Sequence, residues 1–259
     1  MSQLNEKKAL ITGGGTGIGQ AIAFDLAKAG VKVTICGRRS APLEETVDQI
    51  EANGGKARFV LTDMADPESI ETLAKDVLDH GGVDILVNNA GFSSQVRSAR
   101  FVGAEEWRAV MDVNTMGPAM LTRLLLDPMI ENKRGDVVMI ASMAAITPSP
   151  VAGAAYSAAK TAAKAYMNVL QQEVKPFGIR CLTVCPAEVE TPILENRARV
   201  PNDKDRETMI QPEDVSAAVL MALSLPHRST VSEIVIATTI KRDMSADLEA
   251  ALNKQTIES

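Results

Sequence analysis

Aromatic residues and histidine are scarce in this chain. Aromatic residues make up 3% of its 259 residues, and the two histidines, His80 and His227, stand alone. So few aromatic side chains do not form the row of stacking surfaces on which single-stranded nucleic acids bind. A net charge of −6 further disfavours a nucleic-acid partner. Because neither histidine has a companion at ligand spacing, a zinc site and a histidine-based triad are disfavoured, and we expect no metal.

Long apolar runs are missing as well. No stretch approaches the roughly 18 consecutive apolar residues of a membrane-spanning helix, and residues 1–8 contain no apolar signal segment. Among the three cysteines, Cys181 and Cys185 lie four positions apart in an extended run. That spacing is about 13 Å, beyond disulfide reach. We therefore expect a cytoplasmic protein with reduced thiols and no membrane partner.

Short β-branched runs alternate with helix-length segments along most of the chain. The expected strands are Lys8–Thr12, Lys32–Cys36, Ala57–Leu61, Asp84–Asn88, Asp136–Ile140, Arg180–Val184 and Glu233–Ala237. The first expected helix runs from Gly17 to Gly30, and the third begins at the cap Asp66. The other expected helices are Pro42–Asn53, Ala104–Asp112, Pro118–Asn132, Ala155–Phe177, Pro212–Leu223 and Ser245–Lys254. Because most strand centres are continuously apolar, both faces of the sheet should be covered. The pattern predicts an α/β, Rossmann-like fold, a doubly wound parallel sheet of about seven strands with helices on both faces.

The chain shows no repeat, linker or low-complexity segment. We therefore expect one domain over residues 1–259, with a core at about 7–237 and a tail at about 238–259. The longest stretch without periodicity is Pro186–Gln211. Long irregular segments in compact domains are often binding loops, so residues 186–211 are the expected substrate loop.

A glycine-rich turn, residues 12–19, follows the first expected strand and opens the first helix. Glycine permits the tight turn and the close approach of a pyrophosphate, and the free N–H groups of the helix start favour its charge. The alternative is a purely structural turn, but the flanking strand and helix favour phosphate binding.

The end of the second expected strand indicates which nucleotide binds. An acidic residue there would bind an adenosine ribose, whereas this chain has Gly37, Arg38 and Arg39. Glycine leaves room for a 2′-phosphate, and guanidinium groups grip it through paired hydrogen bonds. Against the alternative of a solvated arginine pair, we predict NADP(H).

Tyr156 and Lys160 lie four positions apart at the start of the long expected helix. That spacing places the phenol and the ammonium on one helical face. A cation about 4 Å from the phenolate would lower the phenol pKa from about 10 toward about 7. The other tyrosine, Tyr166, has Leu170 at the same offset. Alone, the pair is more often a surface contact, and its meaning depends on the other motifs.

Together these motifs resemble the classical short-chain dehydrogenase/reductase family of the NADP(H) type. The matching segments are residues 12–19, residues 88–91, Asn114, Ser142, Tyr156 with Lys160, and residues 186–191. They occur in the family's order and spacing, over about residues 7–236. The resemblance implies catalytic roles for Asn114, Ser142, Tyr156 and Lys160.

The implied roles are complementary. Ser142 would hold the substrate carbonyl, Tyr156 would exchange a proton with its oxygen, and Lys160 would bind the nicotinamide ribose. Asn114 would hold a water that links Lys160 to solvent.

The resemblance also implies a set of cofactor contacts. These are Gly13, Gly15, Thr16, Gly17, Ile18, Gly19, Arg38, Arg39, Asp63, Met64, Asn89, Ala90, Gly91, Tyr156, Lys160, Pro186, Val189 and Thr191. The chain departs from the pattern at Ala187, where the family usually has glycine. If that backbone requires a positive φ, alanine is costly there.

The sequence leaves three functions open. The first is an NADP(H)-dependent reductase of a small ketone or hydroxy acid, which the segment Gln211–Pro226 also resembles. The second is a reductase of 3-oxoacyl thioesters carried by acyl carrier protein or CoA. The third is a nucleotide-binding regulatory protein without turnover, which has no need of Ser142 or Tyr156.

The resemblance further implies a homo-oligomer, a tetramer or a dimer, paired through long helices. Six alanines of the long expected helix are small enough to let a helix of another subunit approach closely, and the alternative is that they serve only internal packing. They are Ala155, Ala158, Ala159, Ala162, Ala163 and Ala165.

Overall fold

The computed structural model describes residues 4–255, and within them seven strands form one parallel sheet. The strands are β1 (Lys8–Thr12), β2 (Lys32–Gly37), β3 (Lys56–Leu61), β4 (Ile85–Asn88), β5 (Gly135–Ile140), β6 (Ile179–Pro186) and β7 (Glu233–Ile236). Their order across the sheet is β3-β2-β1-β4-β5-β6-β7. The order reverses between β1 and β4, the point where open α/β sheets form a binding crevice at their carboxyl ends. The predicted fold class is confirmed.

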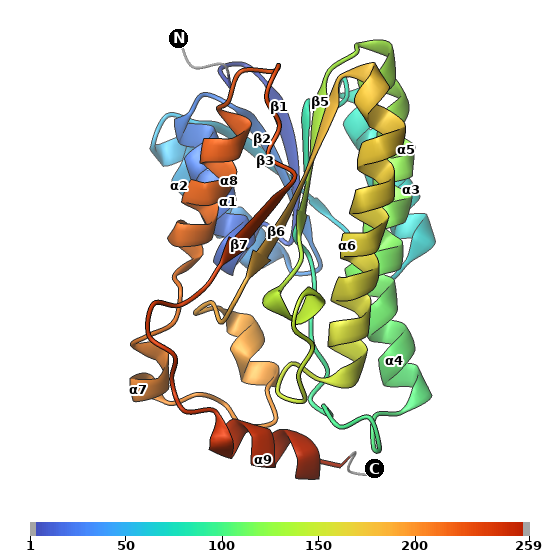
Figure 1. Ribbon diagram of the computed structural model, residues 1–259. Coiled ribbons are helices and arrows are strands. Elements are labelled where there is room, and N and C mark those ends of the chain that lie inside the picture. Colours follow the sequence, from blue (N-terminus) through green and yellow to red (C-terminus); the bar gives the residue numbers. More distant parts are fainter. Residues whose placement is uncertain (1–3, 256–259) are drawn as a thin grey trace.

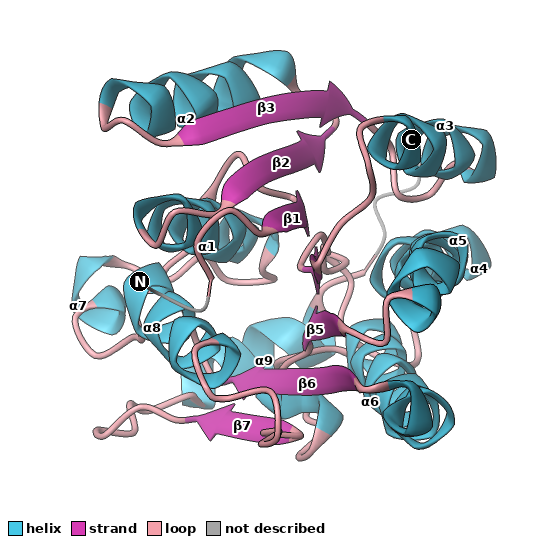
Figure 2. Ribbon diagram, turned by 90° about the horizontal axis from the view of Figure 1, so that it is seen from above, coloured by secondary structure: helices cyan, strands magenta, loops and turns pink. Residues whose placement is uncertain are grey.

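Helices cover both faces of the sheet (Figure 2). The helices are α1 (Gly17–Lys28), α2 (Ser40–Ala52), α3 (Pro67–Asp79), α4 (Ala104–Met111), α5 (Gly117–Glu131), α6 (Ala154–Val174), α7 (Asp203–Arg206), α8 (Pro212–Leu223) and α9 (Ser245–Asn253). One face carries α1, α2 and α8, and the other carries α3, α4, α5 and α6. Each central strand divides its side chains between the two layers, since Ile11 packs with the first group and Leu10 with the second. This double burial is why the strands read as continuous apolar runs.

The expected element boundaries hold closely, with two informative differences. Asp66 caps α3 as predicted, because its side chain accepts a hydrogen bond from the Glu68 N–H. Between α4 and α5, however, Asp112–Met116 forms a π-helical turn. The stretch predicted as irregular contains a 3-10 helix, Pro192–Asn196, and the short α7.

The tail folds back toward the carboxyl edge of the sheet. Figure 1 shows α9 and α7 together at the lower end of the molecule, opposite the end where the N-terminus lies. The three cysteines are free and buried, as predicted. In the described part of the chain, no helix has both the length and the apolar character needed to cross a membrane. The outermost parts of the predicted domain, residues 1–3 and 256–259, lie outside the described residues.

Candidate active site

A cavity of about 750 Å³ lies at the carboxyl ends of the strands. It brings together most of the predicted site residues, although they come from segments far apart in the sequence. The predicted residues that line it are Gly13, Gly15, Thr16, Gly17, Ile18, Arg38, Arg39, Asp63, Met64, Asn89, Ala90, Gly91, Ser142, Tyr156, Lys160, Pro186, Val189 and Thr191. Gly19 and Asn114 are buried and do not line the cavity.

The glycine-rich turn leaves backbone N–H groups available at the cavity. Gly13 and Gly17 have φ values of +68° and +56°, the left-handed region that favours glycine. Thr16 is the N-cap of α1 and makes no side-chain capping bond. The first-turn N–H groups of α1 are therefore not capped by this side chain, and the positive end of the helix dipole faces the cavity. Gly19 packs against Asn89 and the Gly13 carbonyl, where a Cβ has no room.

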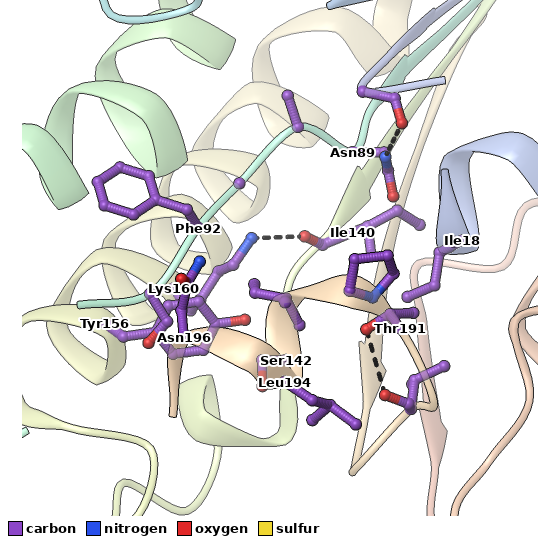
Figure 3. A pocket seen from close by; sticks show the side chains of 18 of the residues that line it. Ile18, Asn89, Phe92, Ile140, Ser142, Tyr156, Lys160, Thr191, Leu194 and Asn196 are labelled. Carbon is purple, nitrogen blue, oxygen red and sulfur yellow. Dashed lines mark hydrogen bonds between the residues drawn. The ribbon is translucent and has the colours of Figure 1, made fainter. Parts of the chain in front are cut away.

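Thr12 braces this turn against the strand that carries the Asn89 segment. Its hydroxyl oxygen accepts hydrogen bonds from the N–H groups of Asn89, at 3.0 Å, and Ala90, at 2.9 Å. Asn89 in turn donates from Nδ2 to the Thr12 carbonyl at 2.8 Å. Asn89, which Figure 3 shows beside the cavity, also donates from Nδ2 to the Gly13 carbonyl at 3.3 Å. The buried Thr12 thus fixes the spacing between β1 and β4, a positioning function that sequence reasoning missed.

The arginine pair at the end of β2 is free to meet a ligand. Arg38 and Arg39 are exposed, line the cavity, and have no ion pair with a described residue. Gly37 has no positive φ, and a Cβ there would lie 3.7 Å from Leu43, an ordinary contact. Glycine is therefore not required by the fold at this position. Asp63 contacts its own turn, since its carboxylate accepts from the Ala65 N–H at 2.9 Å.

Lys160, Tyr156 and Ser142 meet at the inner end of the cavity (Figure 3). Lys160 is 4% exposed and donates from Nζ to the Ile140 carbonyl at 2.9 Å. Its Nζ lies 5.6 Å from the centre of the Tyr156 ring. Ser142 caps a short 3-10 turn, accepting from the Ala144 N–H at 3.1 Å, and its hydroxyl is one of the groups that act on the Tyr156 phenol.

The titration of this group differs from the expectation drawn from helix spacing. Burial raises the pKa of the Tyr156 phenol. The hydroxyl of Ser142 and the charges of Arg97 and Arg197 oppose that rise. Burial also lowers the pKa of Lys160 to about 8. The expectation that Lys160 brings the phenol pKa toward 7 is therefore wrong, because desolvation of the phenol has the largest effect on its pKa.

Asn114 lies in the π-helical turn between α4 and α5. Its Nδ2 donates to the carbonyls of Phe92 and Val110, each at 2.9 Å. Its Oδ1 is buried and has no hydrogen-bond partner. A Cβ added to Gly91 would lie 2.5 Å from this Oδ1 and 3.3 Å from Lys160 Nζ. An unpartnered acceptor beside a buried ammonium is a suitable place for one ordered water.

The backbone after β6 accommodates alanine without strain. Ala187 has no positive φ, and its N–H donates to the Ile236 carbonyl at 2.8 Å. The doubt raised by the missing family glycine therefore falls away. Val189 pairs with Ile210 in an isolated bridge, and Thr191 donates to the Val189 carbonyl at 3.2 Å. These bonds hold residues 186–191 along one wall of the cavity.

An ionic cluster fastens the tail to this wall. Arg242 donates to both carboxylate oxygens of Glu188, at 3.0 and 2.9 Å, and Glu188 lines the cavity. Arg242 also donates to Asp247 of α9, at 2.8 and 3.1 Å, and Arg199 donates to the same carboxylate at 3.0 Å. Asp247 is 3% exposed. The tail helix α9 thus docks on its own chain.

Comparison with known proteins agrees with this geometry. The family model described as short chain dehydrogenase matches residues 7–201. The chain belongs to the short-chain dehydrogenase family. It is 32% identical over 239 residues to an uncharacterised oxidoreductase of Staphylococcus aureus (strain USA300), covering 91% of this chain and 99% of that protein.

Solved structures of this family are similar over nearly the whole chain. A metagenomic short-chain oxidoreductase in complex with NADP is 29% identical, with a TM-score of 0.80 over 93% of this chain and 100% of that one. An alcohol dehydrogenase from the archaeon Thermococcus sibiricus, complexed with 5-hydroxy-NADP, is 27% identical, with a TM-score of 0.84 over 92% of this chain and 99% of that one. A variant of actinorhodin polyketide ketoreductase with NADPH is 30% identical, with a TM-score of 0.82 over 92% and 98% of the two chains.

This short-chain dehydrogenase also has cavity residues that sequence reasoning did not find. Arg97, Asn196, Arg197 and Met244 line the same cavity as Tyr156. They come from the loop after β4, the 3-10 helix after β6 and the tail. No local motif marks them, because their role follows from the folding of distant loops over one end of the sheet.

Proposed function

We propose that this chain is an NADP(H)-dependent oxidoreductase that transfers a hydride between the nicotinamide and a carbonyl or secondary alcohol, with Tyr156 as general acid and base. The observation that carries the proposal is the meeting of Tyr156, Ser142 and Lys160 in a cavity that also contains the glycine-rich turn. A pure nucleotide-binding protein has no use for a phenol and a hydroxyl that line the inner end of such a cavity together. The NADP or NADPH bound in the three similar structures supports the choice of cofactor.

The residues present fit this cofactor. The uncapped start of α1, opening directly from a turn with two left-handed glycines, suits a pyrophosphate. Arg38 and Arg39 have free guanidinium groups for a 2′-phosphate, and Gly37 carries no charge to repel it. Asp63 and Met64 border the adenine side, and Val189 and Thr191 border the nicotinamide side. When bound, the cofactor supplies or accepts the hydride.

The protein's own groups manage the substrate oxygen and its proton. Ser142 donates a hydrogen bond to the substrate oxygen and orients it toward Tyr156. Because burial raises the pKa of Tyr156, the phenol is protonated at neutral pH and ready to donate in the direction of reduction. The ammonium of Lys160 stabilises the phenolate that remains, and Asn114 Oδ1 holds a water through which a proton returns from solvent.

Small ketones or hydroxy acids are the proposed substrates, with 3-oxoacyl thioesters as the alternative. NADPH oxidation with a panel of small ketones, oxo acids and acetoacetyl-CoA tests the choice. Turnover of the small compounds supports the proposal, while turnover restricted to acetoacetyl-CoA supports the thioester alternative. NADPH binding without turnover of any panel member would support a regulatory protein.

We further propose that residues 1–259 act as one domain in a cytoplasmic homo-oligomer. Free, buried thiols suit a reducing compartment. Ala155, Ala159 and Ala163 are buried within the chain, whereas Ala158 and Ala165 are exposed on α6. Exposed Met116 and Val169 add apolar surface at α5 and α6, which lie side by side (Figure 1). A monomeric mass by light scattering at micromolar concentration would contradict the oligomer, and cell fractionation tests the compartment.

A further inference from the structure

Arg97 is a buried cation at the end of the cavity that contains Tyr156, Ser142 and Lys160, called the reacting end below. It lies in the loop after β4, is 4% exposed, and lines the cavity with Tyr156 and Ser142. Its Nη1 donates to Ser93 Oγ and to the Ala152 carbonyl, the latter at 2.7 Å. Its Nη2 donates to the Asn196 carbonyl at 3.1 Å. All three acceptors are neutral, so these bonds position the guanidinium without balancing its charge.

No carboxylate pairs with this arginine. Among the described residues, none places a carboxylate oxygen within 4.0 Å of its nitrogens, and its buried Nε has no hydrogen-bond partner. The Glu106 carboxylate influences it only from a distance, and is itself bound by Ser94 Oγ and the Val96 N–H. A guanidinium has five N–H donors, so three bonds leave two unused. Burying an unpaired charge is costly, and the cost is removed when a ligand brings the opposite charge.

The reacting end of the cavity carries an excess of positive charge. Its charged lining residues are Arg97, Lys160, Arg197 and Glu188, three cations against one carboxylate. Glu188 is already paired with Arg197 and with Arg242. The chain as a whole has a net charge of −6, so this local excess is opposite in sign to the protein. An anionic substrate is therefore attracted to this end specifically.

The guanidinium lies near the reacting atoms. The charge of Arg97 lowers the pKa of the Tyr156 phenol, and Ser93, which Arg97 holds, comes one residue after Phe92 in the cavity wall. Arg97 itself stays charged at neutral pH, because burial and Arg197 lower its pKa only to about 10. Arg97 also packs against Gly153, the N-cap of the helix that carries Tyr156, where an added Cβ would lie 2.8 Å from Arg97 Cδ. A small molecule with its carbonyl at Tyr156 therefore shares this end of the cavity with the guanidinium.

We propose that the substrate bears a carboxylate attached to its carbonyl or alcohol carbon or one carbon away from it, and that Arg97 binds this carboxylate. The inference rests on the proposed function and narrows it to small oxo acids and hydroxy acids. Arg97 then sets specificity by a charge-assisted contact that a neutral ketone or a thioester does not make. A phosphate offers related chemistry, and the experiment separates the two.

The kinetic test compares each acid with its neutral methyl ester. The pairs are 3-oxobutanoate and methyl 3-oxobutanoate, and 2-oxopropanoate and methyl 2-oxopropanoate, each assayed with NADPH. We expect at least one acid to be preferred over its ester, and Arg97→Gln to lower kcat/KM for that acid about 10- to 100-fold while the ester changes little. Arg97→Lys should retain part of the preference. Arg100→Gln, which removes an exposed arginine outside the cavity from the same loop, is the matched control. Equal losses for acid and ester would mean that Arg97 only holds the loops together, and would overturn the proposal.

A binding test needs no turnover. Trp107, the single tryptophan, packs in one cluster with Phe92 and Tyr156 and so reports on this end of the cavity. Butanoate titrated into the wild-type protein, with and without NADPH, should change its fluorescence saturably, and Arg97→Gln should weaken that binding at least tenfold. Stronger binding of inorganic phosphate than of butanoate, or equal butanoate binding by the Arg97→Gln and Arg97→Lys proteins and the wild type, would overturn the assignment. If no carbonyl compound is reduced, the proposed function fails, and this titration still decides the role of Arg97.

Discussion

Lys160 Nζ donates a hydrogen bond of 2.9 Å to the main-chain oxygen of Ile140, the last residue of β5. Ser142 follows Ile140 by two residues, and Tyr156 precedes Lys160 by one helical turn. This bond therefore sets the distance between the strand that delivers Ser142 and the helix that delivers Tyr156. It also keeps the ammonium buried, 5.6 Å from the centre of the Tyr156 ring.

Tyr156→Phe should abolish turnover and leave NADPH binding largely intact. The change removes the proton donor and keeps the ring, so we expect kcat to fall by about 10²- to 10⁴-fold. Steady-state kinetics and NADPH fluorescence titration measure the two effects. Tyr166→Phe is the control, since Tyr166 is the only other tyrosine and does not line the cavity. Parental activity in the Tyr156 variant across the pH range would rule out Tyr156 as the proton donor.

Gly37→Asp combined with Arg38→Leu should shift the nucleotide preference from NADPH toward NADH. The new carboxylate repels a 2′-phosphate and binds a free ribose, and the position has room for it. One charge-assisted contact contributes about 1.5–3 kcal/mol, so the parent should favour NADPH at least about tenfold, less at high salt. Titration of both nucleotides against parent and variant measures the change, with Arg108→Leu as an exposed control outside the cavity. A variant that still prefers NADPH would show that another group reads the phosphate.

Gly91→Ala should lower turnover about 10- to 100-fold, because its Cβ would displace the Asn114 amide and press on the Lys160 ammonium. The variant should still fold, since the crowding is confined to one edge of the site. Gly103→Ala is the matched control, because a Cβ there meets nothing within 4 Å. Full activity in the Gly91 variant would remove Asn114 and Lys160 from the proposed proton path.

Between about pH 8 and pH 10.5, the free energy of unfolding of the parent protein should rise relative to that of the Lys160→Met variant. Below pH 8 the lysine is protonated in both the folded and the unfolded states, and its burial disfavours folding. As the pH passes the folded-state pKa of about 8, the folded protein loses this proton while the unfolded chain keeps it, which favours folding. The shift corresponds to about 3 kcal/mol in the free energy of unfolding. Urea unfolding of both proteins across this range measures the difference, and a constant difference would contradict a lowered lysine pKa.

Asp247→Asn should loosen the tail from the cavity wall. Three arginine N–H groups, two from Arg242 and one from Arg199, lose a buried charged acceptor, which should destabilise the docked tail by about 3 kcal/mol. We expect faster proteolysis within residues 238–255 and a higher KM, because Glu188 and Met244 line the cavity. Asp243→Asn is the control, since that exposed carboxylate bonds only to nearby Ser245. Equal proteolysis of the two variants would mean that the tail is held by apolar contacts instead.

The sheet, the glycine-rich turn and the Tyr156–Lys160 pair can all be predicted from the amino-acid sequence, because each is a local pattern. Strands and helices follow from the period of apolar residues, and the turn follows from the φ freedom of glycine. The four-residue offset of Tyr156 and Lys160 fixes their shared helical face wherever the helix lies. These features need no knowledge of distant contacts, and they were enough to identify the family.

The arrangement of charges around the reacting atoms, by contrast, depends on how the whole chain folds. Arg97 and Arg197 are 100 positions apart, and Glu188 meets Arg242 across 54 positions, so no local spacing links them. The phenol pKa of Tyr156 is likewise not set by a local spacing. It depends on the loops and helices that exclude water from the phenol. Electrostatic interactions act through space and depend on burial, and both are set only when the loops after β4 and β6 and the tail close over the carboxyl edge of the sheet.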